Sequence, residues 1–159
     1  MVLAVSAALA VTMAGCGKDD TPAVSSAQTP TSAATVPVVT TVAPKPTVAT
    51  ATNATLNATV MVDATGKTLY VFDRDTSTTS NCTGNCAGTW PALVLPSGTT
   101  APVAGTGLSG LSAAPRPDDA SKLQVAWNGK PLYTYSADVA PGDAKGDGVG
   151  GVWHAARAA

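Results

Sequence analysis

Two cysteines that lie close together are the residues best suited to chemistry in this chain. Cys82 and Cys86 are separated by a Thr-Gly-Asn triplet. In an exported protein this spacing favours a structural disulfide, which stabilises a fold by roughly 2 kcal/mol in the chain-entropy model. The triplet also favours a tight turn, which brings the two Cα atoms within disulfide distance. We therefore predict that the two cysteines are bonded to each other.

The residues around the cysteine pair fit a redox-active, metal-binding or haem-binding role less well than a structural disulfide. A redox-active dithiol of the thioredoxin type has two intervening residues at the start of a helix, whereas Trp90-Pro91 follow here with no helical pattern. A metal site needs two further ligands, and haem attachment needs a histidine where Ala87 stands. The single histidine, His154, is expected on the surface. We predict no metal and no cofactor, and the redox-active pair remains the alternative.

Four aspartates have the chemistry for catalysis or calcium binding, but each also fits a turn. Asp75 and Asp138 are candidates for an acid/base pair. We predict instead that each accepts bonds from the backbone N–H groups of its own turn. Asp143 and Asp147 lie in a glycine-rich run without the order of an EF-hand, which favours a turn over a calcium site. Because no Ser/His/Asp signature is present, we do not expect an enzyme.

Two β-hairpins are predicted to position these residues. Residues 59–62 and 68–72 are short runs rich in apolar, β-branched and aromatic residues, and they flank an Asp-Ala-Thr-Gly turn signal. Residues 122–127 and 131–135 flank Asn128-Gly129, which is the strongest short hairpin signal. A single hairpin is marginally stable in water, so we expect the two to pack together.

The two hairpins belong to a repeat. A shift of 63 residues aligns Val62/Val125, Gly66/Gly129, Lys67/Lys130, Leu69/Leu132, Tyr70/Tyr133, Asp75/Asp138, Gly88/Gly151, Trp90/Trp153 and Ala92/Ala155, with Phe72/Tyr135 as a conservative match. The first repeat is predicted at about 59–93 and the second at about 122–156. The expected fold is all-β: a small antiparallel sandwich or barrel of pseudo-two-fold symmetry over residues 55–159. Trp90 and Trp153 should be equally buried, each near the tyrosine of its own repeat.

The repeated motif resembles a known family. Tyr70-Val-Phe72-Asp-Arg-Asp75 and Tyr133-Thr-Tyr135-Ser-Ala-Asp138, with the tryptophans that follow them, are similar to the bacterial lipoproteins called "secreted repeat of unknown function". The resemblance covers residues 59–156. It implies an envelope location and a two-repeat domain, and it implies no activity.

The amino terminus is predicted to be a lipoprotein signal peptide, residues 1–16. Its first fifteen residues carry no charge and are too few to span a bilayer comfortably. They end in Met-Ala-Gly before Cys16, which resembles a bacterial lipobox. The resemblance implies that Cys16 is diacylated and anchors the chain in the membrane, since two acyl chains hold a protein stably. Because no basic residue precedes the apolar run, we expect the true start to lie upstream.

A disordered tether is predicted between this anchor and the domain. Residues 17–54 are rich in Pro, Thr, Ala and Val, have no aromatic residue and show no helical or alternating period. Such a segment buries too little apolar area to offset the entropy lost on ordering.

Composition limits the function. The net charge is −1 and no basic stripe is present, which argues against nucleic-acid binding. We expect a non-enzymatic lipoprotein on the extracytoplasmic face of the bacterial cell membrane, with a binding or structural role. Its partners would be membrane lipid, through acylated Cys16, and cell-wall or envelope components. The alternative is a redox protein that uses the cysteine pair or carries electrons through its Tyr and Trp cluster.

Overall fold

A computed structural model describes residues 44–158 of the chain. The predicted signal peptide, the lipidation site Cys16 and the tether as far as residue 43 lie outside the described residues. No helix within the described part is long and apolar enough to cross a membrane.

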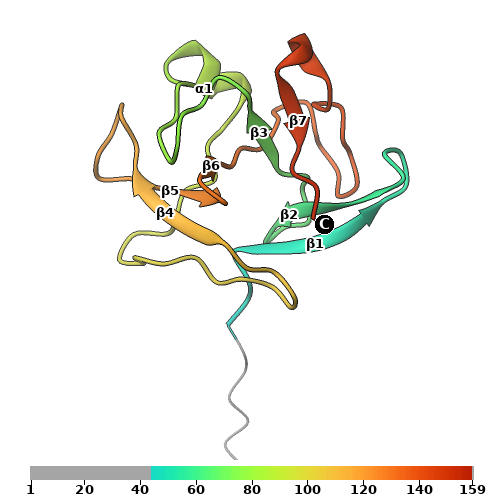
Figure 1. Cartoon of the computed structure of the whole chain (residues 1–159), viewed down its shortest axis with the longest axis horizontal. Coiled ribbons are helices and arrows are strands. Elements are labelled where there is room, and N and C mark those ends of the chain that lie inside the picture. Colours follow the sequence, from blue (N-terminus) through green and yellow to red (C-terminus); the bar gives the residue numbers. More distant parts are fainter. Residues whose placement is uncertain (1–43, 159) are drawn as a thin grey trace, which may run out of the picture. The chain divides into compact units, whose positions relative to one another are not determined.

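The described residues form short antiparallel strands with one short α-helix (Figure 1). In chain order the elements are β1 (Val48–Asn53), β2 (Ala58–Asp63), β3 (Tyr70–Phe72), α1 (Asn85–Thr89), β4 (Leu111–Pro115), β5 (Leu123–Trp127), β6 (Lys130–Pro131), the 3-10 helix η1 (Val149–Gly151) and β7 (Trp153–Ala155). The sheets are β1–β2, β3–β7 and β4–β5–β6. The predicted all-β class is confirmed.

Both hairpin turns form where the sequence predicts them. After β2, the Asp63 carboxylate accepts hydrogen bonds from the backbone N–H groups of Thr65 at 2.7 Å and Lys67 at 3.1 Å. Between β5 and β6, Asn128 and Gly129 have φ values of 47° and 79°. Positive φ at both central positions is what a two-residue type I′ hairpin turn requires.

The predicted boundary between tether and domain is wrong. Strand β1 falls inside the segment assigned to the tether, residues 17–54, and pairs with β2 along its whole length, from Val48 opposite Asp63 to Asn53 opposite Ala58. Val48 has no exposed surface. Strand β1 consists of Val, Ala, Thr and Asn, so it contains few large apolar side chains. It is ordered by pairing with β2, which a composition argument does not detect.

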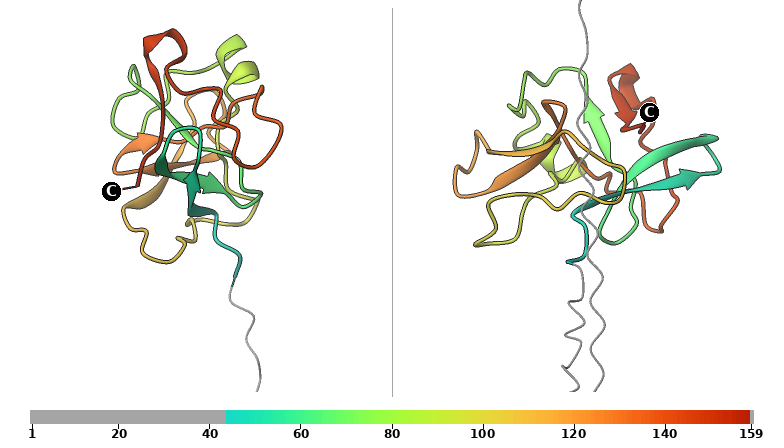
Figure 2. Two further views of the ribbon diagram at one scale, coloured as in Figure 1. Left: turned by 90° about the vertical axis from the view of Figure 1, so that its right-hand side faces the viewer. Right: turned by 60° about the horizontal axis from the view of Figure 1, so that its bottom comes forward.

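Each repeat therefore begins one strand earlier than predicted. The strands β1 and β4 are related by the same shift of 63 residues that relates the hairpins. The loops that carry α1 and η1, which also correspond, lie at the same end of the domain (Figure 1, Figure 2).

The two repeats exchange their last segments. Strand β3 of the first repeat pairs with β7 of the second, so that Phe72 lies opposite Trp153. The equivalent bridge joins Ala92 of the first repeat to Tyr133 of the second. Between them, Tyr70 and Tyr133 bond each other through their backbones, N to O at 2.8 Å and 3.0 Å. The predicted pseudo-two-fold relation is confirmed, and the repeats are interlocked.

Candidate functional site

Four aromatic rings stack in a column at the centre of the interlocked repeats. The order is Phe72, Trp153, Trp90, Tyr135. Ring centroids are 4.2 Å apart between Phe72 and Trp153, 3.8 Å between the two tryptophans and 4.3 Å between Trp90 and Tyr135. The tryptophan planes are only 3° from parallel. The column thus alternates between repeats, because each tryptophan stacks on the second aromatic residue of the other repeat.

Two tyrosines meet this aromatic column edge-on. Tyr70 packs against Trp90 at 5.4 Å, and Tyr133 packs against Trp153 at 5.1 Å. The tryptophans are 4% and 5% exposed. Equal burial beside the tyrosine of the same repeat is confirmed. The backbones differ in detail, because Trp153 begins β7 whereas Trp90 directly follows α1.

The tyrosine hydroxyls reach across to the aspartates of the opposite repeat. Tyr70 donates to Asp138 Oδ2 at 2.5 Å, and Tyr133 donates to Asp75 Oδ2 at 2.6 Å. Hydroxyl–carboxylate bonds of this length are typical of charge-assisted pairs. The sequence argument missed these partners, which are 68 and 58 residues apart in the chain.

The other oxygen of each aspartate holds a turn, as predicted. Asn81 N donates to Asp75 Oδ1 at 2.7 Å, and Lys145 N donates to Asp138 Oδ1 at 3.0 Å. An acid/base pair would need both carboxylates to face one reacting group, whereas each binds a different phenol. Both carboxylates therefore belong to the structural framework of the repeats.

Burial changes the proton affinities in these pairs. Loss of hydration, together with the bond to Asp138, raises the pKa of Tyr70 well above its ordinary value. Burial and the bond to Asp75 do the same to the pKa of Tyr133. Burial also raises the pKa of Asp75, against the opposing effect of the Tyr133 hydrogen bond. Both tyrosines consequently hold their protons at neutral pH and donate them in the hydrogen bonds.

The predicted disulfide is present. Cys82 and Cys86 are bonded, with Cα atoms 5.2 Å apart. Contrary to the sequence argument, a helix does begin here: α1 includes Cys86, although it is only five residues long. Cys82 is fully buried and packs in the cluster that contains the aromatic column. The bond thus fixes the loop that supplies Asn81 to Asp75.

Replacing both cysteines by serine is expected to lower the melting temperature without unfolding the domain. A loss of about 2 kcal/mol corresponds to roughly 10 °C for a domain of this size. The measurement is thermal unfolding by circular dichroism, with Ala87→Ser in the same helix as the control. An unchanged melting temperature, or free thiols in aerobically purified protein, contradicts a structural disulfide. A redox-active pair predicts reduced and oxidised forms of similar stability.

A buried arginine that the sequence argument did not single out holds the second repeat to the first. Arg116 is 5% exposed and binds both oxygens of Asp118 at 2.8 Å. It also donates to Gln124 Oε1 at 2.7 Å and to the carbonyl of Cys82 at 3.2 Å. The 63-residue shift places Arg116 opposite Asn53, but the two residues differ, so the sequence carries no signal for a shared role.

Asn53 has the equivalent role in the first repeat. It is 2% exposed, and its Nδ2 donates to the carbonyl of Gly142 in the second repeat at 3.0 Å. A buried polar side chain thus lies at the end of β1 (Asn53) and directly after β4 (Arg116), and each holds a loop of the other repeat. Together with the crossed tyrosine–aspartate bonds, these contacts make the repeats mutually dependent.

The glycine-rich run of the second repeat is a turn, as expected. Asp143 Oδ2 accepts the backbone N–H of Val139 at 2.9 Å, and Asp147 Oδ1 accepts that of Ala155 at 2.8 Å. Within residues 44–158, no three His, Cys, Asp or Glu side chains gather as a metal site requires. A Cβ on Gly146 would lie 2.8 Å from the Tyr70 and Trp90 rings, so only glycine fits there.

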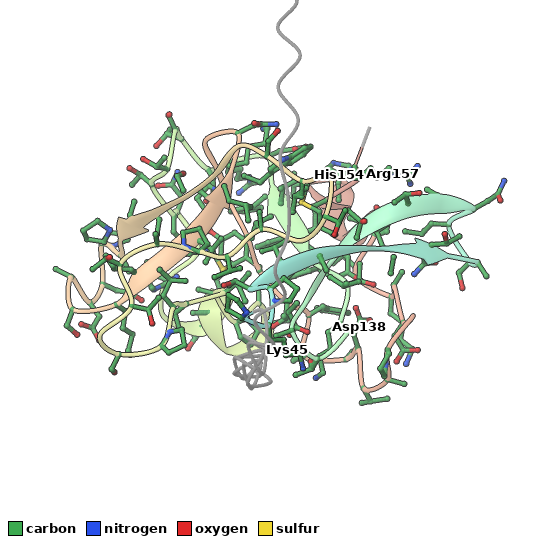
Figure 3. All side chains as sticks on the ribbon, turned by 90° about the horizontal axis from the view of Figure 1, so that it is seen from below. Lys45, Asp138, His154 and Arg157 are labelled. Carbon is green, nitrogen blue, oxygen red and sulfur yellow. A yellow bond between two sulfur atoms is a disulfide. The ribbon has the colours of Figure 1, made fainter. Side chains whose placement is uncertain are left out.

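The remaining predicted residue, His154, lies on the surface. Its Nε2 is 3.0 Å from Oδ2 of Asp73, which directly follows the neighbouring strand β3, and both side chains are about half exposed. Figure 3 labels His154 and Asp138, which lie apart in that view.

Trp127, the one aromatic residue outside the group of six core rings, lines a surface hollow and also packs against the hydrophobic cluster that contains Val125. Trp127 ends β5, is partly buried, and donates from Nε1 to the carbonyl of Ser109 at 3.0 Å. The hollow measures about 250 Å³. It is lined by Gly107, Leu108, Ser109, Trp127, Asn128 and Ala158. The first repeat has Ala64 at the equivalent position, so the repeat fold does not require this ring.

Comparison with known proteins places the chain in a described family. The model of a family described as "secreted repeat of unknown function" matches residues 54–94 and 118–157, just over half of the chain. The two matched segments cover the two repeats from β2 and β5 onward, without their first strands β1 and β4. No curated protein and no solved structure matches.

Proposed function

The chain belongs to the secreted repeat family of unknown function, and on that premise we propose that it is a non-enzymatic envelope module that binds cell-wall glycan. It is held on the extracytoplasmic face of the membrane by acylated Cys16. The hollow at Trp127 is the observation that carries the binding role.

The side chains of the repeated motif support this proposal because they contact one another in the interior and are not available to a ligand. The aromatic rings stack on one another, and the tyrosines and aspartates bond one another across the repeats. Among the described residues, no buried side-chain polar atom lacks a hydrogen-bond partner. The motif therefore builds the scaffold, and a ligand has to be recognised by the surface.

Trp127 has the chemistry of a sugar platform. An indole face packs against the C–H face of a pyranose, while nearby polar groups bond the hydroxyls. The bond from Nε1 to Ser109 holds the ring in one orientation, and the exposed Asn128 supplies an amide at the rim. The volume suits one sugar unit of a polymer. The proposed anchor at Cys16 keeps the domain beside the cell wall, so the polymer is taken to be peptidoglycan.

The experiment uses the full chain with Cys16→Ala. Without the acylated cysteine but with the apolar export signal intact, the protein is expected in the culture medium. Recovery with the membranes instead contradicts lipid anchoring and leaves the glycan assay unaffected.

The secreted protein is then sedimented with purified peptidoglycan. We expect it to pellet, and Trp127→Ala to weaken the apparent affinity about tenfold or more, as loss of an aromatic anchor does. Val139→Ala is the control, because Val139 is 76% exposed and lies outside the hollow. Failure of the parent protein to pellet, or equal binding by Trp127→Ala, refutes the glycan role.

A further inference from the structure

The aromatic column and its crossed tyrosine–aspartate pairs are arranged so that the loss of one electron can move from ring to ring and be stored as a radical. Trp90 and Trp153 are stacked at 3.8 Å, which is van der Waals contact between two readily oxidised indoles. Each also touches a tyrosine, Tyr70 or Tyr133, edge-on. Every ring in this group is in contact with the next.

We propose that the paired tryptophans accept one-electron oxidation and that Tyr70 and Tyr133 store the hole as neutral tyrosyl radicals, with Asp138 and Asp75 as the proton acceptors. The proposal does not depend on glycan binding, because none of these residues lines the hollow at Trp127.

The chemistry balances with an external one-electron oxidant of the class of oxidised metal complexes. The oxidant takes one electron from Trp90 or Trp153, is itself reduced, and leaves an indole radical cation. The neighbouring tyrosine returns an electron to the indole while its hydroxyl proton moves along the existing hydrogen bond to the carboxylate. The products are a neutral indole, a tyrosyl radical and a protonated aspartate. A later one-electron reduction reverses both transfers.

The hydrogen bonds are suited to this step. The phenol–carboxylate distances are 2.5 Å for Tyr70 and 2.6 Å for Tyr133, so the proton has a short path and no side chain has to move. Both tyrosines and Asp138 have no exposed surface, which keeps water away from the radicals. Burial raises the pKa of Asp75 and makes that carboxylate a stronger base.

The column has different ends. Tyr135 lies at one end, is partly exposed, and stacks on Trp90 at 4.3 Å. Phe72 lies at the other end and is much harder to oxidise than an indole or a phenol. The hole is therefore expected to enter from the Tyr135 end and to stop before Phe72. The hole has a preferred direction because the repeats differ at this motif position, which is Phe72 in the first repeat and Tyr135 in the second.

The experiment generates tris(bipyridine)ruthenium(III) by a light flash in the presence of a sacrificial electron acceptor and the full chain. Radicals are assigned by electron paramagnetic resonance and their formation is followed by transient absorption. We expect an indole radical that decays into a tyrosyl radical, with slower decay in deuterated water. Tyr70→Phe and Tyr133→Phe should each remove part of the tyrosyl signal.

The decisive variant is Asp75→Asn with Asp138→Asn, in which an amide can still accept the phenol bond but cannot take its proton. The tyrosyl yield should fall about tenfold or more, with the indole radical persisting. The control is Asp119→Asn, which removes a carboxylate paired with Lys122 and away from the column. Near-ultraviolet circular dichroism of the stacked indoles checks that each variant is folded. Equal tyrosyl yields in parent and double variant, or a tyrosyl yield that both Tyr→Phe changes together leave undiminished, overturns the proposal. If the double variant fails to fold, the Tyr→Phe pair alone decides.

Discussion

Trp90→Ala is expected to destabilise the domain by about 3–5 kcal/mol, the range for truncating a buried tryptophan. That is a large share of the 5–15 kcal/mol by which domains of this size are stable. The ring is 4% exposed and contacts Trp153 and Tyr135 face-on and Tyr70 edge-on. Its loss leaves a cavity that interrupts the aromatic column and separates the two repeats.

Trp153→Ala should cost about as much, because this ring is 5% exposed and has the equivalent neighbours. The measurement is urea unfolding followed by far-ultraviolet circular dichroism. Trp127→Ala is the matched control and should cost clearly less, since its ring is partly exposed. Two core variants that differ from each other by more than about 2 kcal/mol, or that match the control, would contradict equivalent roles for the two tryptophans.

The second large effect is expected from Tyr70→Phe. This change removes one hydroxyl and leaves the fully buried Asp138 with Lys145 N as its remaining hydrogen-bond donor. A hydrogen bond to a buried charged group is worth about 1.5–3 kcal/mol, and the unpaired oxygen adds its own desolvation cost. We expect a loss near the upper end of that range in the free energy of unfolding.

Tyr133→Phe is the matched comparison and should cost less. Its acceptor, Asp75, is only partly buried, so water can replace the phenol there, although the bond between the Tyr133 hydroxyl and Ser80 Oγ at 2.8 Å is also lost. Combining Tyr70→Phe with Asp138→Asn in a double-mutant cycle isolates the pair. A coupling energy near zero, or a larger loss for Tyr133→Phe, would show that the crossed pairs do not hold the repeats as described.

Much of the local structure could be predicted from the sequence because its signals are local. Asn128-Gly129 marks a turn by backbone preference, and the 63-residue identity between motifs marks the repeat. The disulfide followed from the short spacing of Cys82 and Cys86.

What was missed depends on contacts between distant parts of the chain. Strand β1 has the composition of a linker and becomes a strand by pairing with β2. An alignment of repeats shows that Tyr70 and Tyr133 are equivalent, but it does not show that each bonds the aspartate of the other repeat. The buried Arg116 lies before a proline in a polar stretch, where sequence patterns predict an exposed side chain.

The exchange of final segments between repeats has a consequence for how such a domain arises. In a single repeat, the last segment would have no strand to pair with. Its tyrosine and its aspartate would each lack the hydrogen-bond partner that the other repeat supplies. Two separate copies could satisfy each other as a closed, symmetric dimer, but only at sufficient concentration. Joining them in one chain makes the association intramolecular and independent of concentration. In a dilute extracellular setting, joining the two repeats in one chain thus removes the concentration dependence that two separate copies would have.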